Sequence, residues 1–151
     1  MIAYRITNET YKNDISGNGA ALYGSRWNSK GSPLLYTSQF ISLSILESLV
    51  HLQKKEIPPT QYLLQIEFPD ENEMAMISYK KIKKNWHKEL EYTQWLGDQF
   101  LQNNRNLTLQ VPSAIVPQEN NFLLNPLHPD FKKVKIIHSE LLDLDKRLTE
   151  Y

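Results

Sequence analysis

Cysteine is absent from the 151 residues of this chain. Its absence excludes disulfides, thiolate nucleophiles and cysteine-ligated metal sites together, and it is compatible with a reducing compartment. The four histidines, His51, His87, His128 and His138, are scattered along the chain and form no HExxH motif. Because neither of the usual zinc-ligand patterns is present, we expect no bound metal.

Net charge and long apolar runs are also missing. The 17 basic residues balance 17 acidic residues, so bulk attraction to nucleic acid or to an anionic membrane is not indicated. No segment approaches the roughly 18 consecutive apolar residues of a membrane-spanning helix. Polar residues interrupt residues 1–9 too early for the apolar region of a signal peptide. We expect a cytoplasmic protein that binds neither membranes nor nucleic acid directly.

Two common enzyme signatures are incomplete or absent. Residues 17–19 read Gly-Asn-Gly, as a dinucleotide-binding loop begins, but Leu22 stands where the third glycine belongs, so a Rossmann fold is not predicted. No serine lies in a GxSxG motif, which argues against an α/β-hydrolase. No internal repeat or linker-like stretch divides the chain, and we interpret residues 1–151 as a single compact domain.

Hydrophobic periodicity predicts the secondary structure. Apolar and polar residues alternate over Ile2–Ile6, as in a strand, whereas the apolar spacing of three and four residues after Ser38 predicts a helix over about 40–54. Thr37 or Ser38 can cap the start of this helix, and Pro58-Pro59 lies shortly beyond its end. The other expected elements are a loop over 17–31, a second helix over 88–103, and strands over 33–37, 62–68, 107–111, 113–116, 122–124 and 134–137. Two helices among several strands, without regular alternation, favour an α+β fold with mixed or antiparallel sheets.

Arg26 is the first candidate functional residue. It lies between Ser25 and Trp27 in a small, glycine-flanked stretch where a ligand can approach the backbone. Its guanidinium can hold a phosphate or carboxylate through two hydrogen bonds. The alternative is a surface arginine stacked on Trp27, and the segment alone does not decide between the two.

Glu47 is the second candidate, because it lies inside the predicted helix among mostly apolar neighbours. Ser44 and His51 share its stripe at positions i−3 and i+4. A carboxylate beside so much apolar surface needs water, a cation or hydrogen-bond donors on its own side. An active-site cleft would provide them. The alternative is a solvent-facing Glu–His pair on an ordinary amphipathic helix.

Two further residues lie at the ends of predicted strands. The ring of Tyr36, just before the helix, is placed to flank a ligand that meets the helix, although an aromatic there is more often part of the core. Ser113 lies between Pro112 and Ala114, and the prolines at 112 and 117 limit ladder pairing, so its hydroxyl can be presented at a strand end. Considered alone, Ser113 is explained more simply by a structural role than by a functional one.

The segment 79–88 is locally basic and interleaved with aromatic residues. It can form a patch that binds phosphate or nucleic acid, or simply a solvated face. The acidic stretch 67–73 precedes it closely, and the chain has no basic excess elsewhere, which favours the solvated face.

Several short motifs, taken in order, resemble the RES family. They are Tyr4-Arg5, Gly19-Ala20, Gly24-Ser25-Arg26-Trp27-Asn28, Gly31, Leu35-Tyr36-Thr37-Ser38, Leu46-Glu47-Ser48-Leu49-Val50-His51, Val111-Pro112-Ser113 and the segment from Asn121 to Phe131. The family is named for an Arg, a Glu and a Ser, which map onto Arg26, Glu47 and Ser113. The resemblance spans nearly the whole chain, although residues 70–105 contain no family motif.

This resemblance implies an ADP-ribosyltransferase-like fold and the toxin half of a bacterial toxin–antitoxin pair. It implies that NAD is the substrate, that the nicotinamide–ribose bond is cleaved, and that no metal is required. In this interpretation Glu47 stabilises the developing oxocarbenium-like ribose and Arg26 holds the pyrophosphate. Tyr36 stacks on nicotinamide or lines its pocket, and Ser113 hydrogen-bonds to the ribose or the amide. The remaining residues expected to bind NAD are Asn28 and Asn125.

The acceptor of the ADP-ribosyl group stays open at this point. Water gives hydrolysis and phosphate gives phosphorolysis, both of which deplete NAD, whereas a protein side chain gives ADP-ribosylation of a specific target. A third alternative is a non-enzymatic module that binds RNA or a protein through residues 80–88. We expect a cognate antitoxin with an Xre-like helix-turn-helix part to cover the cleft at Arg26 and Glu47. A homodimer is also compatible with the sequence.

Overall fold

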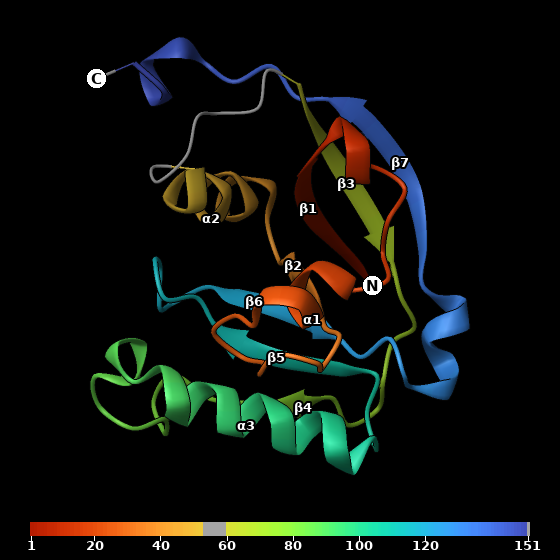
Figure 1. The fold of residues 1–151 in the computed structure, drawn as a ribbon, viewed down its shortest axis with the longest axis vertical. Coiled ribbons are helices and arrows are strands. Elements are labelled where there is room, and N and C mark those ends of the chain that lie inside the picture. Colours follow the sequence, from red (N-terminus) through yellow and green to blue (C-terminus); the bar gives the residue numbers. More distant parts are fainter. Residues whose placement is uncertain (53–59, 151) are drawn as a thin grey trace.

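Seven strands join in one sheet in the computed structural model, which describes residues 1–52 and 60–150. Their order across the sheet is β4-β5-β6-β2-β1-β3-β7 (Figure 1). The strands are β1 (Ile2–Asn8), β2 (Leu35–Ser38), β3 (Gln61–Glu67), β4 (Ala75–Met76), β5 (Thr108–Pro112), β6 (Asn120–Leu124) and β7 (Lys135–Leu141). β4 and β5 are parallel, and the other neighbouring pairs are antiparallel. The predicted α+β class with a mixed sheet is confirmed.

The sheet is weakest where β1 meets β2. These strands share one register pair, Tyr4 with Ser38, whereas β1 pairs with β3 along its whole length, from Ile2 to Asn8. As a result β1, β3 and β7 diverge from β2, β6 and β5 on either side of the junction (Figure 1). This divergence leaves room for a cleft above the junction.

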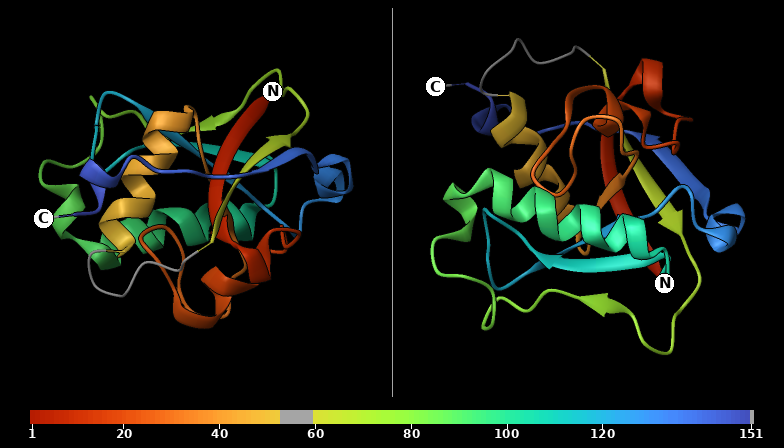
Figure 2. Two further views of the ribbon diagram at one scale, coloured as in Figure 1. Left: turned by 90° about the horizontal axis from the view of Figure 1, so that it is seen from above. Right: turned by 60° about the horizontal axis from the view of Figure 1, so that its bottom comes forward.

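Three α-helices flank the sheet within the described residues: α1 (Asn18–Tyr23), α2 (Ile41–Leu52) and α3 (Leu90–Asn103). α2 packs against β1 and β2, and α3 runs beside β5 (Figure 2). Short 3-10 segments cover Glu9–Tyr11, Trp86–Lys88, Pro129–Lys133 and Lys146–Leu148. No helix in residues 1–52 or 60–150 has the length and apolar character needed to span a bilayer.

Alternation along the strands divides the core between the two faces of the sheet. On β6, Phe122 and Leu124 belong to one buried cluster, while Leu123 belongs to the other, which also contains Trp27 and Phe100. This is the arrangement expected of a central strand whose successive side chains point to opposite faces. α3 covers the second cluster with Phe100.

α1 lies within the segment 17–31 that the sequence predicted to be a loop. The helix has six residues, too few for a periodic pattern to stand out. Gly17 before it and Gly24 after it adopt φ values of 73° and 68°, a conformation that glycine tolerates best. A Cβ on Gly17 would also lie 2.7 Å from the backbone nitrogen of Leu34.

The predicted strand over 113–116 is wrong. β5 ends at Pro112, and the next residue, Ser113, begins a turn. Its Oγ accepts hydrogen bonds from the backbone nitrogens of Ile115 and Val116, at 3.0 and 3.1 Å. This local bonding competes with strand pairing and directs the chain into β6. β5 and β6 therefore form a hairpin.

The predicted helix over 40–54 is confirmed as α2, which begins at Ile41; residues 53–54 and Pro58-Pro59 lie outside the described residues. The predicted cap by Thr37 is wrong, because its hydroxyl donates to the carbonyl of Phe122 at 2.7 Å. Ser38 is the last residue of β2 and is not adjacent to the helix start. The two-residue strand β4 was not predicted.

Candidate functional site

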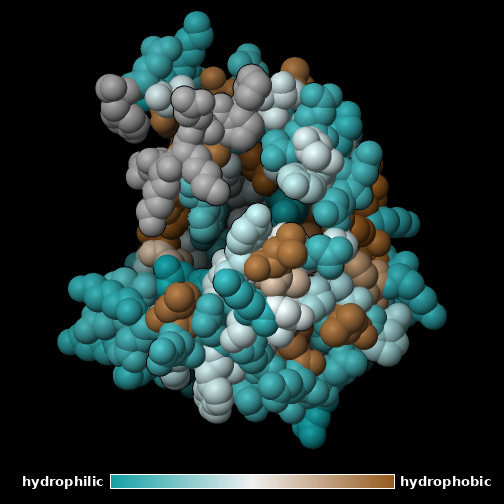
Figure 3. All heavy atoms as spheres, in the orientation of Figure 1, coloured by the Kyte–Doolittle hydropathy of each residue, from teal (hydrophilic) through white to brown (hydrophobic). Residues whose placement is uncertain are grey.

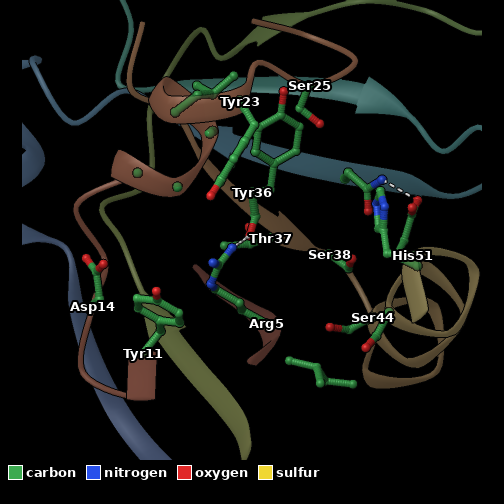
Figure 4. A pocket seen from close by; sticks show the side chains of 18 of the residues that line it. Arg5, Tyr11, Asp14, Tyr23, Ser25, Tyr36, Thr37, Ser38, Ser44 and His51 are labelled. Atoms are coloured by element: carbon green, nitrogen blue, oxygen red, sulfur yellow. Dashed lines mark hydrogen bonds between the residues drawn. The ribbon is translucent and has the colours of Figure 1, made fainter. Parts of the chain in front are cut away.

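A cleft of about 510 Å³ opens over the junction of β1 and β2. Residues of α1 and α2 form its sides, and residues of β1 and β2 lie between them (Figure 4). The surface view shows the hollow between these parts of the molecule (Figure 3). Its charged or ionisable lining includes Arg5, Asp14, Glu47 and His51. Within the described residues, no group of three histidine or acidic side chains is arranged to hold a metal ion.

Glu47 lines the cleft from α2, and donors on the β5–β6 hairpin hold its carboxylate. Oε1 accepts from the hydroxyl of Ser113 at 2.8 Å and from Nδ2 of Asn121 at 2.7 Å. Oε2 has no hydrogen-bond partner within residues 1–52 and 60–150. The carboxylate is therefore oriented at one oxygen and free to meet a ligand at the other.

Ser113 is fully buried and lies behind Glu47, not in the lining of the cleft. Its oxygen accepts two backbone N–H bonds from the turn and donates its single proton to Glu47. A hydroxyl has one proton to donate, so the orientation of this one is fixed. The structure thus brings together Ser113 and Glu47, which are 66 residues apart in sequence.

Arg5 is the cation of the cleft, and sequence reasoning did not identify it as a site residue. Nη1 donates to the carbonyl of Tyr36 at 3.1 Å, and Nε is buried without a partner among the described residues. Burial lowers the pKa of the guanidinium, and the nearby Asp14 carboxylate opposes that shift. An arginine nevertheless stays protonated in proteins. Nε is enclosed, but Nη2 has no hydrogen-bond partner among the described residues, so Arg5 offers a positive charge and a free amino group beside the cleft (Figure 4).

Asp14 balances part of this charge. Its pKa is lowered, first by hydrogen bonds from the side chain and backbone of Ser16 and to a smaller extent by Arg5. Two exposed aromatic side chains, Tyr11 and Tyr23, also line the cleft (Figure 4). The cleft thus combines a cation, two carboxylates and aromatic surface.

Tyr36 lines the cleft with its ring while its hydroxyl is engaged elsewhere. The hydroxyl donates to Oδ1 of Asn28 at 2.7 Å and accepts from the backbone nitrogen of Trp27 at 3.0 Å. Burial raises the pKa of this phenol strongly, more than its hydrogen bonds lower it. Tyr36 is therefore a neutral aromatic wall that also anchors the segment after α1.

Asn28 was expected to bind NAD, but it is fully buried and does not line the cleft. Its Nδ2 is within 3.2 Å of the carbonyl oxygens of Ala20, Ser29 and Ser32. Oδ1 accepts from Tyr36, so every polar group of this buried side chain is bonded within the protein. In the structure Asn28 links α1 to β2 through these hydrogen bonds.

Arg26 also lies outside the lining of the cleft, although its neighbour Ser25 is part of it. Its Nη1 donates to the carbonyl of His87 at 2.9 Å, and its guanidinium lies 5.7 Å from the ring centre of Trp86. The expected stacking partner, Trp27, instead packs against Trp86 in the core. Arg26 thus ties the glycine-flanked segment to the segment before α3.

Asn125 follows β6 at the end remote from Glu47 and does not line the cleft. It is fully buried, donates to Oδ1 of Asn104 at 2.8 Å, and accepts from the backbone nitrogen of Leu127 at 3.0 Å. These hydrogen bonds pair both ends of the Asn125 amide, so its burial is accounted for by local structure. Of the predicted site residues, Glu47 and Tyr36 line the cleft, and Ser113 contacts Glu47 directly.

The fold is shared with a toxin of known structure. The chain superposes on a chain of the crystal structure of the M. tuberculosis MbcT–MbcA toxin–antitoxin complex with a TM-score of 0.76, covering 93% of this chain and 83% of that one. Sequence identity between the two is 16%. The likeness is therefore one of fold.

Sequence comparison identifies the family. The RES domain profile matches residues 2–145. "Toxin Res" of Photorhabdus laumondii is 36% identical, covering 99% of this chain and 98% of that protein. The "Prs ADP-ribosylating toxin" of a Sphingobium species is 38% identical, covering 83% of this chain and 81% of that protein. This chain belongs to the RES family of toxins.

Proposed function

We propose that this chain is an enzyme that cleaves the bond between nicotinamide and ribose in NAD. The observation that supports this most is the pairing of a free carboxylate oxygen on Glu47 with the Arg5 guanidinium in one cleft. NAD requires both features, because its pyrophosphate is anionic and its ribose becomes positively charged as nicotinamide leaves. The family resemblance supports the same substrate.

In this proposal each residue of the cleft has a separate role in cleaving NAD. The C1′–N bond breaks, and its electron pair leaves with nicotinamide, which departs neutral. Oε2 of Glu47 stabilises the positive charge that develops on the ribose. Arg5 binds the pyrophosphate through Nη2, in the role that the sequence analysis gave to Arg26. The ring of Tyr36 lines the nicotinamide pocket.

Three other predicted residues act indirectly in this proposal. Ser113 holds Glu47, Asn28 fixes the hydroxyl of Tyr36, and Arg26 ties down the segment that carries Ser25. No step needs a metal ion. Residues 1–151 then act as one domain, because Ser113 and Asn121 complete a site whose other groups come from the N-terminal third of the chain.

The proposal is tested by the substitution Glu47→Gln. Purified protein should consume NAD and release nicotinamide, and the variant should lose at least about 99% of this activity, because a neutral amide no longer stabilises the cation. Glu91→Gln is the matched control, since Glu91 is an exposed glutamate on α3 outside the cleft. Full activity of Glu47→Gln in a folded protein would remove Glu47 from the mechanism.

The group that captures the ribosyl cation defines the reaction. Water or phosphate would deplete NAD, which we propose as the main outcome. The name of the Sphingobium relative favours ADP-ribosylation of a protein as the second candidate. Mass spectrometry of the products, with and without phosphate and cell lysate, separates free ADP-ribose, its phosphorylated form and a modified protein.

A non-enzymatic binding module is the alternative outside enzymes. It would act through the basic segment, where Lys80 and Lys83 are exposed. In that case NAD would stay intact, while Lys80→Glu with Lys83→Glu would abolish a salt-sensitive interaction with RNA. We expect these two substitutions to leave NAD turnover unchanged.

We also propose that a separately encoded antitoxin restrains this toxin by covering the cleft. The structural neighbour is a toxin–antitoxin complex, and the family resemblance indicates an antitoxin with an Xre-like helix-turn-helix part. Expression of the toxin alone should stop growth and lower NAD, and co-expression of the antitoxin should restore both. Normal growth and normal NAD at high expression of folded protein would count against the toxin assignment.

A further inference from the structure

Asn121 is the second residue of β6, and its side chain reaches Glu47 on α2. Nδ2 lies 2.7 Å from Oε1, the oxygen that also accepts from Ser113. An ionised carboxylate only accepts hydrogen bonds, so the NH₂ group of Asn121 must face it. The contact with Glu47 therefore determines which way the amide points.

This orientation leaves the other end of the amide unsatisfied. Oδ1 of Asn121 is buried and has no hydrogen-bond partner within the described residues. Buried carbonyl oxygens are nearly always paired in folded proteins, and an unpaired one destabilises the fold. Fold stability therefore does not explain an asparagine at this position.

The backbone of Asn121 is held on both sides. It is in register with Ser38 of β2 and with Val111 of β5, in the interior of the sheet. The side chain consequently projects from a rigid point next to the cleft, which it helps to line. Such a support is what a catalytic carboxylate needs in order to keep one geometry.

We infer that Asn121 is a positioning residue for the reaction proposed above, on which this inference rests. Together with Ser113 it holds Oε1 of Glu47, so that Oε2 faces the ribosyl cation. Asn121 does not bind NAD through Oδ1, because that atom is enclosed. Its loss should therefore change the rate of bond cleavage and not the affinity for NAD.

Two substitutions of Asn121 test the inference kinetically. Asn121→Leu removes the donor together with the unpaired acceptor, and Asn121→Asp replaces the donor with a carboxylate that repels Glu47. Each should lower kcat by about 10- to 100-fold, because a displaced catalytic group loses its alignment. The KM for NAD should stay within about threefold of the unchanged protein.

Asn120→Asp is the matched control. It makes the same chemical change one residue earlier on β6, where the side chain points to the opposite face and is outside the cleft lining. Its kcat should equal that of the unchanged protein. Unchanged kcat in both Asn121 variants, or a raised KM with unchanged kcat, would overturn the inference.

A spectroscopic measurement tests the contact without relying on turnover. The side-chain amide resonances of Asn121 in a ¹H–¹⁵N spectrum should shift in Glu47→Gln and stay in place in Glu91→Gln. Unmoved resonances in Glu47→Gln would overturn the inference even if the Asn121 variants failed to fold. Full NAD turnover by Glu47→Gln would overturn both proposals, whereas an inactive Glu47→Gln beside fully active Asn121 variants would overturn this inference alone.

Discussion

The two arginines near the cleft differ in what their guanidinium groups contact. Nη2 of Arg5 has no partner among the described residues and Arg5 lines the cleft, whereas Arg26 is engaged with His87 and Trp86 outside it. In our proposal Arg5 binds the ligand and Arg26 has a positioning role. The amino-acid sequence alone favoured Arg26 as the anion clamp, because a motif identifies the residue type and not the direction of its side chain; in the structure Arg5 lines the cleft and Arg26 does not.

Arg5→Lys should raise the KM for NAD by about 10- to 100-fold, because a lysine keeps the charge but loses the planar fork that bonds a phosphate twice. Steady-state kinetics at varied NAD measure this effect. In the same assay Arg26→Lys should change the KM much less and should lower the melting temperature. A larger rise in KM for Arg26→Lys than for Arg5→Lys would indicate that Arg26, and not Arg5, binds the pyrophosphate.

Tyr36→Phe should destabilise the fold by about 1–3 kcal/mol, because it leaves the amide of Trp27 and Oδ1 of Asn28 without their partner. Urea unfolding measures this loss near neutral pH. The pH dependence has a definite sign. The pKa of Tyr36 is raised in the folded state, so its contribution to stability is complete below the unfolded pKa of about 10 and declines above it.

Unfolding curves of Tyr36→Phe and the unchanged protein should therefore converge as the pH rises above about 10, where the unfolded tyrosine ionises. Other tyrosines and lysines titrate in the same range and affect both proteins alike, so only the difference between the curves is diagnostic. A difference in stability that is independent of pH up to 11.5, about 1.5 pH units above the tyrosine reference value, would contradict the buried state of this phenol.

Among the elements, α3 depends on one glycine. Gly97 faces the backbone of Trp27, and a Cβ there would lie 1.6 Å from its carbonyl oxygen. Gly97→Ala should therefore destabilise the fold by about 3 kcal/mol or more, although alanine is ordinarily better in a helix by about 1 kcal/mol. Thermal or urea unfolding checks the sign.

Gly19→Ala is the control for this prediction. Gly19 lies in α1, and a Cβ there would have no neighbour within 4 Å. Alanine should be neutral or slightly stabilising at this position, in accord with helix propensity. Equal effects of the two substitutions would mean that α3 does not pack as closely on Trp27 as the structure shows.

Periodicity was enough to predict the longer elements. α3 and β3 follow from their apolar spacing, because each presents buried side chains to the core. α2 follows from the same spacing, although Leu43 is its only apolar side chain that is buried. α1 and β4 have six and two residues and carry no such signal. The turn after Pro112 was interpreted as a strand because its residues are mostly apolar, while the bonds of Ser113 to the turn depend on a local geometry that composition does not reveal.

Prediction of the site residues was limited in the same way, because it depends on three-dimensional contacts. Glu47 stood out because a carboxylate among apolar helix residues needs a reason. Arg5 did not, because a polar residue within an alternating strand is normally explained by solvent on one face. Asn121 could not be identified for a different reason. Its contact with Glu47 depends on which strands are neighbours, and the order β6-β2-β1 cannot be deduced from spacing along the chain.

At the scale of the whole molecule, the narrow junction of β1 and β2 raises the question of cooperativity. One register pair joins the two flanks of the sheet there, but α2 packs against both strands and Glu47 bonds to the β5–β6 hairpin. We therefore expect the flanks to unfold together. Buried tryptophans 27 and 86 report on one flank through their fluorescence.

Urea unfolding followed by tryptophan fluorescence and by far-ultraviolet circular dichroism should then give a single, coincident transition. NAD turnover, measured after brief transfer to each urea concentration, should disappear at the same midpoint. Two separated transitions would instead assign the flanks to independent folding units and contradict the interpretation of residues 1–151 as one domain.

The hydrogen bonds that hold Glu47 come late in the chain. Its partners Ser113 and Asn121 follow it by 66 and 74 residues, and a protein is synthesised from its N-terminus. A nascent chain still on the ribosome carries the carboxylate and the cation long before it carries the hairpin that aligns them. Under the proposed mechanism, a nascent chain whose β5–β6 hairpin has not yet been synthesised lacks the contacts that orient Glu47, so it should not turn over NAD until translation is well advanced.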